Sequence, residues 1–200
     1  PFMLHAIGMS PNVLKKKGYE ELNYSWLQQT LDISSVSLHK VIRYADEADI
    51  LADGGSIVAL SYIGAQRIFS KYSDMNDAKA LLESIGRSFG YIYGRERNVR
   101  INTISQSPTK TTAGSGVKGF DRLLDFAERM SPLGNATADD CADYCITLFS
   151  DLTRRVTMQN LFNDGGFSSM GMSLRALQQY EKGLHEDCDC GPAGEEHLYD

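Results

Sequence analysis

Apolar residues recur along this chain with two different periods, and the two periods alternate. Short apolar or β-branched runs bounded by turn residues are typical of buried strands. Longer stretches with apolar residues at every third or fourth position are typical of helices packed on a core. The predicted strands are Phe2–Ala6, Ile57–Leu60, Val99–Ser105 and Asn160–Asn163. The predicted helices are about Tyr24–Ala48, Asp74 to about Tyr93, Phe120–Met130 and a segment from Thr137. This alternation predicts a parallel sheet flanked by helices.

The stretch from Ser56 to Lys79 carries the most chemical information. Its strand brings Ser61 and Tyr62 to the carboxyl end, which is where open α/β sheets bind ligands. A helix is expected to begin at Ser73 or Asp74, because both residue types are good N-caps.

Tyr72 lies at the entrance of that helix, and Lys79 follows seven residues later. Seven residues are nearly two helical turns, so the two side chains are expected to share one face. A lysine ammonium beside a tyrosine lowers the pKa of the phenol, and such a pair can donate to a developing oxyanion. The alternative is an ordinary pair on a solvated helix face. Tyr62, ten residues before Tyr72, favours the catalytic interpretation.

The pattern Ser-Tyr-x9-Tyr-x6-Lys, formed by Tyr62, Tyr72 and Lys79, resembles that of bacterial enoyl-acyl-carrier-protein reductases. These are divergent short-chain dehydrogenase/reductases. Ordinary members of that superfamily carry Tyr-x3-Lys, whereas here the residue four before Lys79 is Met75. The resemblance extends from about Phe2 to Met172. It implies the C-terminal portion of a doubly wound, Rossmann-type α/β fold.

The resemblance also implies a reaction. NADH would reduce the trans-2 double bond of an enoyl-acyl-carrier-protein thioester in fatty-acid synthesis, with hydride added at C3. Tyr72 would hydrogen-bond the enolate oxygen, and Lys79 would hold the cofactor ribose. Tyr62 would line the site, and its part in the reaction is left open.

Two loops are expected to contact the cofactor by the same resemblance. After the first strand, Ile7 and Gly8 would touch it while Ser10 faces substrate; a plain Gly-Pro turn is the alternative. After the third strand, a Pro-x-x-Thr turn would bind the nicotinamide amide and the pyrophosphate, with a Ser/Thr-rich loop of no function as the alternative. The residues assigned to the cofactor there are Thr109, Lys110, Thr111, Thr112 and Ala113.

Gly114–Gly119 matches G-x-G-x-x-G but does not directly follow a strand, and no acidic residue ends a strand about twenty positions later. We therefore assign it to a substrate loop, about 109–130, that closes over the site. Lys118 and Arg122 are candidate docking charges for acidic acyl carrier protein, or else solvated surface.

Composition narrows the class of protein. Two hundred residues suit one domain, and the net charge of −6 argues against a nucleic-acid surface.

Cys141 and Cys145 fall on apolar helix positions and are expected to be core residues of a reduced, cytoplasmic protein. The family resemblance implies that the helix over Tyr24–Ala48 packs on the sheet and helps build a homotetramer.

Residues 1–172 are assigned to the reductase domain and residues 173–200 to an extra tail. A helix from Leu174 to Lys182 is expected there, followed by an acidic segment. His185, Cys188 and Cys190 form no recognised metal site, so no metal is predicted.

Compared with the family, about three strands and the glycine-rich turn are missing before Phe2. We expect that N-terminal half to exist outside this sequence, because the chain alone should bind NADH poorly and leave one sheet edge unpaired. Two other interpretations stay open. One is a short-chain carbonyl reductase, and the other is a non-catalytic oligomerisation or regulatory fragment.

Overall fold

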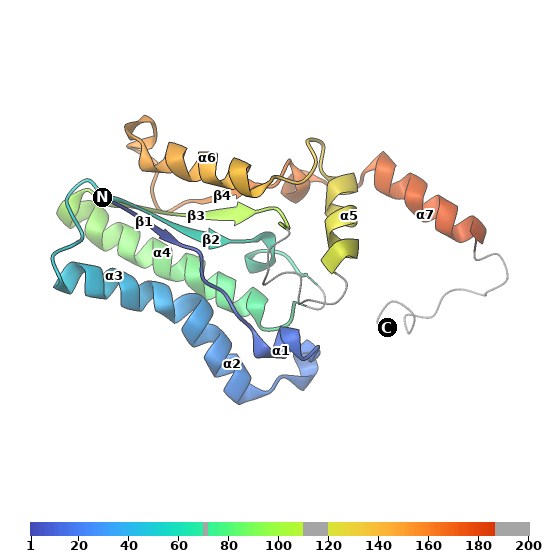
Figure 1. Cartoon of the computed structure of the whole chain (residues 1–200), viewed down its shortest axis with the longest axis horizontal. Helices are drawn as coiled ribbons and strands as arrows, with labels where there is room; N and C mark the ends of the chain where they lie inside the picture. The colour runs from blue at the N-terminus through green and yellow to red at the C-terminus, as the bar shows by residue number, and fades with distance from the viewer. Residues whose placement is uncertain (70–71, 110–119, 187–200) are drawn as a thin grey trace.

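The computed structural model of the chain describes residues 1–69, 72–109 and 120–186. Four parallel strands form one sheet in the order β1-β2-β3-β4 (Figure 1). The strands are β1 Phe2–His5, β2 Ser56–Ser61, β3 Arg100–Gln106 and β4 Asn160–Asn163. Because all four strands run the same way, their carboxyl ends lie at one edge of the sheet. The predicted α/β class with a parallel sheet is confirmed.

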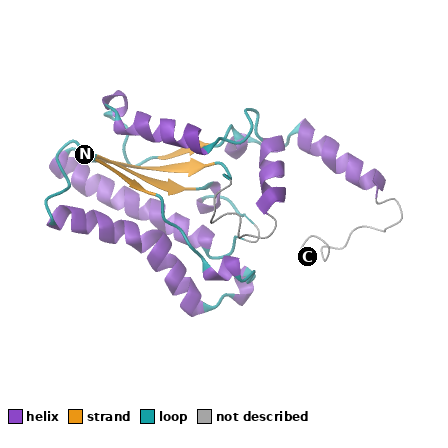
Figure 2. Ribbon diagram, viewed as in Figure 1, coloured by secondary structure: helices purple, strands orange, loops and turns teal. Residues whose placement is uncertain are grey.

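Helices cover both faces of this sheet (Figure 2). On one face lie α2 (Tyr24–Leu31), the π-helical turn η2 (Asp32–Val36), α3 (Ser37–Glu47) and α4 (Met75–Arg97). On the other face lies α6 (Ala138–Phe149). Beyond the carboxyl ends of the strands lie α5 (Phe120–Met130) and α7 (Leu174–Glu186). The short elements are α1 (Pro11–Leu14), η1 (Tyr19–Glu21), η3 (Ile63–Ala65), η5 (Asp151–Thr153) and η6 (Phe167–Ser169).

Alternate side chains of β2 enter two separate cores, as expected for a strand buried on both faces. Ile57 and Ala59 pack in the core beneath α3 and α4. Val58 packs in the core beneath α6, together with Cys141 and Cys145, which are free thiols. Both cysteines are therefore core residues, as predicted.

The end of α4 differs from the sequence prediction. Gly94 was expected to end this helix near Tyr93, but the helix continues to Arg97. It ends at Asn98, which adopts a left-handed conformation with φ of 54°. Arg97 donates to the Leu51 carbonyl at 2.6 Å, and this contact stabilises the additional turn.

The predicted helix over Tyr24–Ala48 is interrupted by the π-helical turn. Two buried serines of that turn contact other elements. The Ser34 hydroxyl accepts from the Met9 N–H at 2.9 Å and donates to the Met9 carbonyl at 3.0 Å. The Ser35 hydroxyl donates to the Ala78 carbonyl on α4. The turn thus joins the loop after β1 to α4, and π turns are frequent beside functional sites.

The remaining boundaries follow the sequence closely. Thr137 and Asp140 form a reciprocal capping box at the start of α6. The tail helix α7 begins at Leu174 as expected but extends past Lys182 to Glu186.

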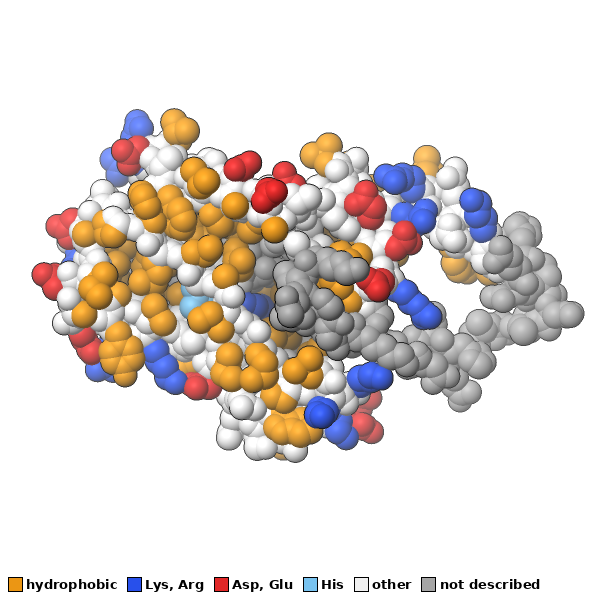
Figure 3. Space-filling model, viewed as in Figure 1, with side chains coloured by type: hydrophobic (Ala, Val, Ile, Leu, Met, Phe, Trp, Pro, Cys, Tyr) orange, Lys and Arg blue, Asp and Glu red, His pale blue; other side chains and the backbone are white. Residues whose placement is uncertain are grey.

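The outer edge of β1 pairs with no strand of the described residues. Phe2 and Leu4 are 66% and 50% exposed, and apolar side chains gather on this face of the molecule (Figure 3). The Phe2 ring stacks on Phe149 of α6, with centroids 5.1 Å apart. None of the helices in the described ranges is long and apolar enough to cross a bilayer.

Candidate functional site

The candidate site forms at the carboxyl edge of the sheet. Tyr62 directly follows β2, and the loop of Ile7 and Gly8 follows β1. The Lys79 ammonium, on α4, joins the two strand ends. Its Nζ donates to the Leu60 carbonyl at 2.8 Å and to the Ile7 carbonyl at 3.3 Å.

Lys79 is 9% exposed, and its surroundings determine its charge. Burial lowers the pKa of Lys79 to about 8, while the Glu83 carboxylate acts in the opposite direction. An ammonium carries three N–H donors, and two of those of Lys79 donate to the Ile7 and Leu60 carbonyls. In the described residues no acceptor pairs with the third. A Cβ added to Gly8 would lie 3.6 Å from Nζ, so the glycine keeps this side of the ammonium open.

Tyr72 lies just before α4 rather than on it. Ser73 adopts a left-handed conformation with φ of 46°, and the helix begins only at Met75. Asp74 is the N-cap, one of the two predicted candidates, and the helical repeat does not reach Tyr72, so the shared side of Tyr72 and Lys79 stays a prediction.

The predicted lowering of the Tyr72 pKa is wrong. Burial raises the pKa of Tyr72, and the Lys79 ammonium is directed at the two strand-end carbonyls. Across the parts of the chain that the structure describes, no group hydrogen-bonds the Tyr72 hydroxyl. Tyr72 is thus a neutral phenol whose hydroxyl can donate to a ligand.

Tyr62 lies beside Tyr72, with ring centroids 5.3 Å apart. Its hydroxyl donates to the side-chain oxygen of Asn76 in the first turn of α4. Burial raises the pKa of Tyr62, so it too is neutral. Of the two tyrosines, Tyr62 has its hydroxyl committed within the protein.

A row of aromatic rings leads away from the two tyrosines. Phe69 lies 6.2 Å from Tyr62 between ring centroids, and Phe167 lies 6.4 Å from Phe69. Phe126 of α5 then lies 6.3 Å from Phe167. The row offers an apolar surface that extends from the tyrosine hydroxyls to α5.

The loop after β1 is fastened to the start of α4 by a buried carboxylate. Asp74 accepts from the Ser10 hydroxyl at 2.6 Å and from the Asn12 amide at 2.7 Å. All three side chains are at most 4% exposed. The substrate contact expected of Ser10 stays a prediction, and the structure gives the Ser10 hydroxyl this internal partner.

Thr109, after β3, donates its hydroxyl to the Ser107 carbonyl at 3.0 Å. Arg122 is exposed on α5. Several predicted residues lie outside the described residues: Lys110, Thr111, Thr112, Ala113, the glycines of 114–119, Lys118, Cys188 and Cys190. The side chain of His185 is also not described. The described residues contain no cluster of His, Cys, Asp or Glu able to hold a metal.

Sequence reasoning missed three side chains that organise this site: Asp74 as a link to the β1 loop, Asn76 and Glu83. Glu83 could have been found, since an acidic residue one helical turn after Lys79 is visible in the sequence. The partners of Asp74 and Asn76 are distant in sequence, and no local pattern indicates them.

A protein-family model described as Enoyl-(Acyl carrier protein) reductase matches residues 1–168. Among curated relatives, Enoyl-[acyl-carrier-protein] reductase [NADH] 2 of Rhizobium meliloti is 33% identical over 179 residues, covering 88% of this chain and 66% of the relative. The enzyme named Enoyl-[acyl-carrier-protein] reductase [NADH] FabI from Rickettsia bellii is 36% identical, covering 85% of this chain and 64% of its own length. The chain thus spans slightly under two thirds of these relatives.

Solved structures of enoyl-acyl-carrier-protein reductases also match this chain. A FabI–NADH complex from Alistipes finegoldii is 69% identical, with a TM-score of 0.87, covering 91% of this chain and 64% of that chain. An enoyl-[acyl-carrier-protein] reductase (NADH) from Aquifex aeolicus is 33% identical, with a TM-score of 0.77. The match covers 86% of this chain and 66% of that chain.

Proposed function

The chain belongs to the enoyl-(acyl carrier protein) reductase family, and on that premise we propose that it acts in NADH-dependent reduction of enoyl thioesters in fatty-acid synthesis. The substrate is a trans-2-enoyl group carried by acyl carrier protein. The observation that carries this proposal is a half-buried, neutral Tyr72 whose hydroxyl has no hydrogen-bond partner among the described residues, while Lys79 of α4 binds the carbonyls at the strand ends of the same edge.

The residues at the strand ends fit a nicotinamide cofactor. Among the described residues, two carbonyls accept from the three N–H donors of Lys79, and Gly8 places no side chain beside the ammonium, which suits the hydroxyls of a ribose. Ile7, Gly8, Lys79 and Thr109 would hold the cofactor, together with residues 110–113. When bound, NADH supplies the hydride that adds to C3 of the substrate.

Tyr72 then acts on the charge that develops as hydride is added. The thioester carbonyl oxygen becomes an enolate oxygen, and a neutral phenol donates a hydrogen bond to it. A raised pKa suits this role, because a phenolate could not donate. Lys79 keeps the local field positive, and C2 of the enolate finally takes up a proton from solvent water.

Tyr62 orders the site rather than serving as the main donor, because its hydroxyl already donates to Asn76. The aromatic row from Tyr62 through Phe69 and Phe167 provides an apolar surface for the acyl chain. Ser10 remains a candidate substrate contact through its backbone.

Residues 109–130 form the proposed substrate loop, with Lys118 and Arg122 as candidate contacts for acyl carrier protein. A homotetramer and a cytoplasmic location remain the expectation. Domain limits of 1–172, with a separate tail, are part of the same proposal.

The direct test compares two substrate classes in the full protein. NADH consumption is measured with a trans-2-enoyl-acyl-carrier-protein and with a ketone of matched chain length. We expect consumption only with the enoyl thioester, with the saturated thioester identified by mass spectrometry. Reduction of the ketone alone would instead identify a carbonyl reductase, and consumption with neither would reject both activities.

A further inference from the structure

Glu83, in the middle of α4, is a buried acid that the proposed reaction does not use. It is 4% exposed. Its carboxylate accepts from the Ser61 hydroxyl at 2.7 Å and from the Gln66 amide at 3.2 Å. Burying a carboxylate costs free energy unless it is hydrogen-bonded or paired with a cation. We therefore asked which groups of the site this carboxylate stabilises.

The two hydrogen-bond partners lie on either side of Tyr62. Ser61 is the last residue of β2 and directly precedes Tyr62. Gln66 follows η3 in the segment that leads from Tyr62 toward Tyr72. A single carboxylate therefore fixes the strand end and the start of the connection between the two tyrosines.

Glu83 also lies one helical turn after Lys79, where the two side chains share a face of α4. Its negative charge opposes the effect of burial on the lysine. His5 of β1 interacts with Lys79 but is held neutral, and Arg87 lines a pocket with Glu83 between α4 and β3. Glu83 is therefore the acid whose charge acts on Lys79.

We propose that Glu83 is a positioning residue of the tyrosine–lysine site, which holds Ser61 and Gln66 in place and provides the counter-charge of Lys79. Its effect on turnover rests on the proposed function, whereas its effect on the charge of Lys79 does not.

The electrostatic part is tested with Glu83→Gln, which removes the charge but keeps the size of the side chain. The titration of Lys79 is followed by NMR of lysine labelled with ¹³C at Cε, with the Lys79 signal identified by its loss in Lys79→Arg. We expect the midpoint to lie about one pH unit below that of the wild type, since a nearby opposite charge favours the ammonium. The alkaline limb of kcat should move to lower pH by the same amount.

Glu96→Gln is the matched control, because it removes the same charge from an exposed position of the same helix. It should leave both the Lys79 midpoint and the alkaline limb unchanged.

The positioning part is tested separately with Ser61→Ala, which removes one hydrogen bond and keeps both charges. We expect an unchanged Lys79 midpoint and a kcat lowered about tenfold or more, as for loss of one hydrogen bond to a charged group. This variant remains informative even if Glu83→Gln does not fold.

An unchanged Lys79 midpoint in Glu83→Gln would overturn the counter-charge, and an unchanged kcat in Ser61→Ala would overturn the positioning role. A wild-type protein that fails to reduce enoyl thioesters would reject the proposed function instead. The NMR titration would still decide the relation between Glu83 and Lys79.

Discussion

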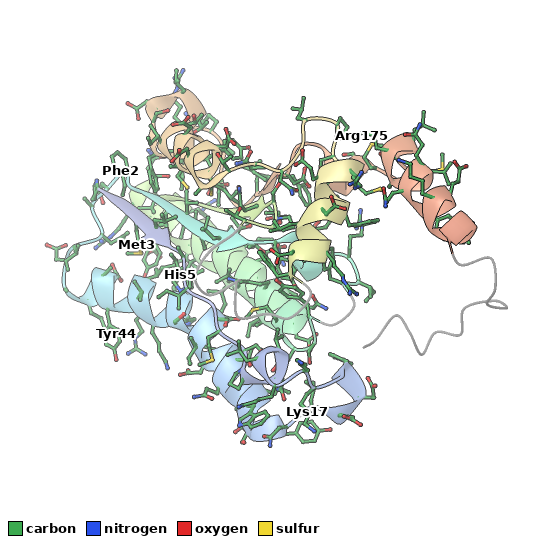
Figure 4. All side chains as sticks on the ribbon, turned by 45° about the vertical axis from the view of Figure 1, so that its right-hand side comes forward. Phe2, Met3, His5, Lys17, Tyr44 and Arg175 are labelled. Carbon is green, nitrogen blue, oxygen red and sulfur yellow. The ribbon has the colours of Figure 1, made fainter. Side chains whose placement is uncertain are left out.

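At the residue scale, His5 shows how the site affects a neighbouring side chain. His5 ends β1, where its label in Figure 4 marks it beside α3. Its Nε2 lies 2.8 Å from the Ser37 hydroxyl, which donates to the Ile33 carbonyl and so accepts from the histidine. Nδ1 is buried, with no partner among the described residues. Burial and the nearby Lys79 lower the pKa of His5 to about 4.

This pKa makes the protein less stable in acid. The unfolded state binds a proton at His5 near the ordinary pKa of 6.5, whereas the folded state resists protonation until about pH 4. Stability should therefore fall as pH drops from 6.5 to 4, by up to about 3 kcal/mol. Urea unfolding across this range should show a smaller loss in His5→Gln than in wild type.

His39→Gln is the control, because His39 is an exposed histidine of α3. It should keep the acid sensitivity of the wild type. Equal acid sensitivity in His5→Gln and wild type would contradict the assignment of this effect to His5.

At the scale of elements, the Asp74 carboxylate determines how the β1 loop meets α4. In Asp74→Ala, the Ser10 hydroxyl and the Asn12 amide would be left buried without their acceptor. We expect a loss of about 2–3 kcal/mol in the free energy of unfolding. Asp77→Ala, an exposed change on the same helix, should cost less than about 0.5 kcal/mol. A similar cost for both variants would show that the carboxylate does not hold the loop.

The left-handed residue Asn98 ends α4, and its conformation gives a second prediction for this helix. Asn98→Gly should be neutral or slightly stabilising, because glycine adopts positive φ without steric cost. Asn98→Ala should destabilise by about 1 kcal/mol. Thermal unfolding of both variants provides the measurement, and an alanine variant as stable as the glycine variant would rule out this account of the helix end.

Elements with strong local patterns were predictable from the sequence, and elements fixed by distant contacts were not. The β2 strand and the α6 capping box follow from residues adjacent in the chain. The true end of α4 depends on Arg97 contacting Leu51, and the π-helical turn depends on serines contacting other elements. Gly94 is a genuine stop signal in sequence, but tertiary contacts override it.

At the scale of the whole molecule, the sequence predicted which strand ends lie at one edge of the sheet but not how the side chains there interact. Parallel strands place Tyr62 and the Gly8 loop at one edge, as the fold class requires. The direction of the Lys79 ammonium, toward two strand-end carbonyls, depends on the packing of α4 against β1 and β2. Burial then raises the pKa of Tyr72, whereas the sequence predicted that Lys79 would lower it.

The most direct test of this account is turnover of a trans-2-enoyl-acyl-carrier-protein by the full protein with Tyr72→Phe. Phenylalanine keeps the ring and its contact with Tyr62 but removes the hydroxyl that we propose as the donor to the enolate oxygen. We expect a fall in kcat of about 100-fold, because one donor to the developing oxyanion is lost. Turnover equal to that of the wild type would contradict it.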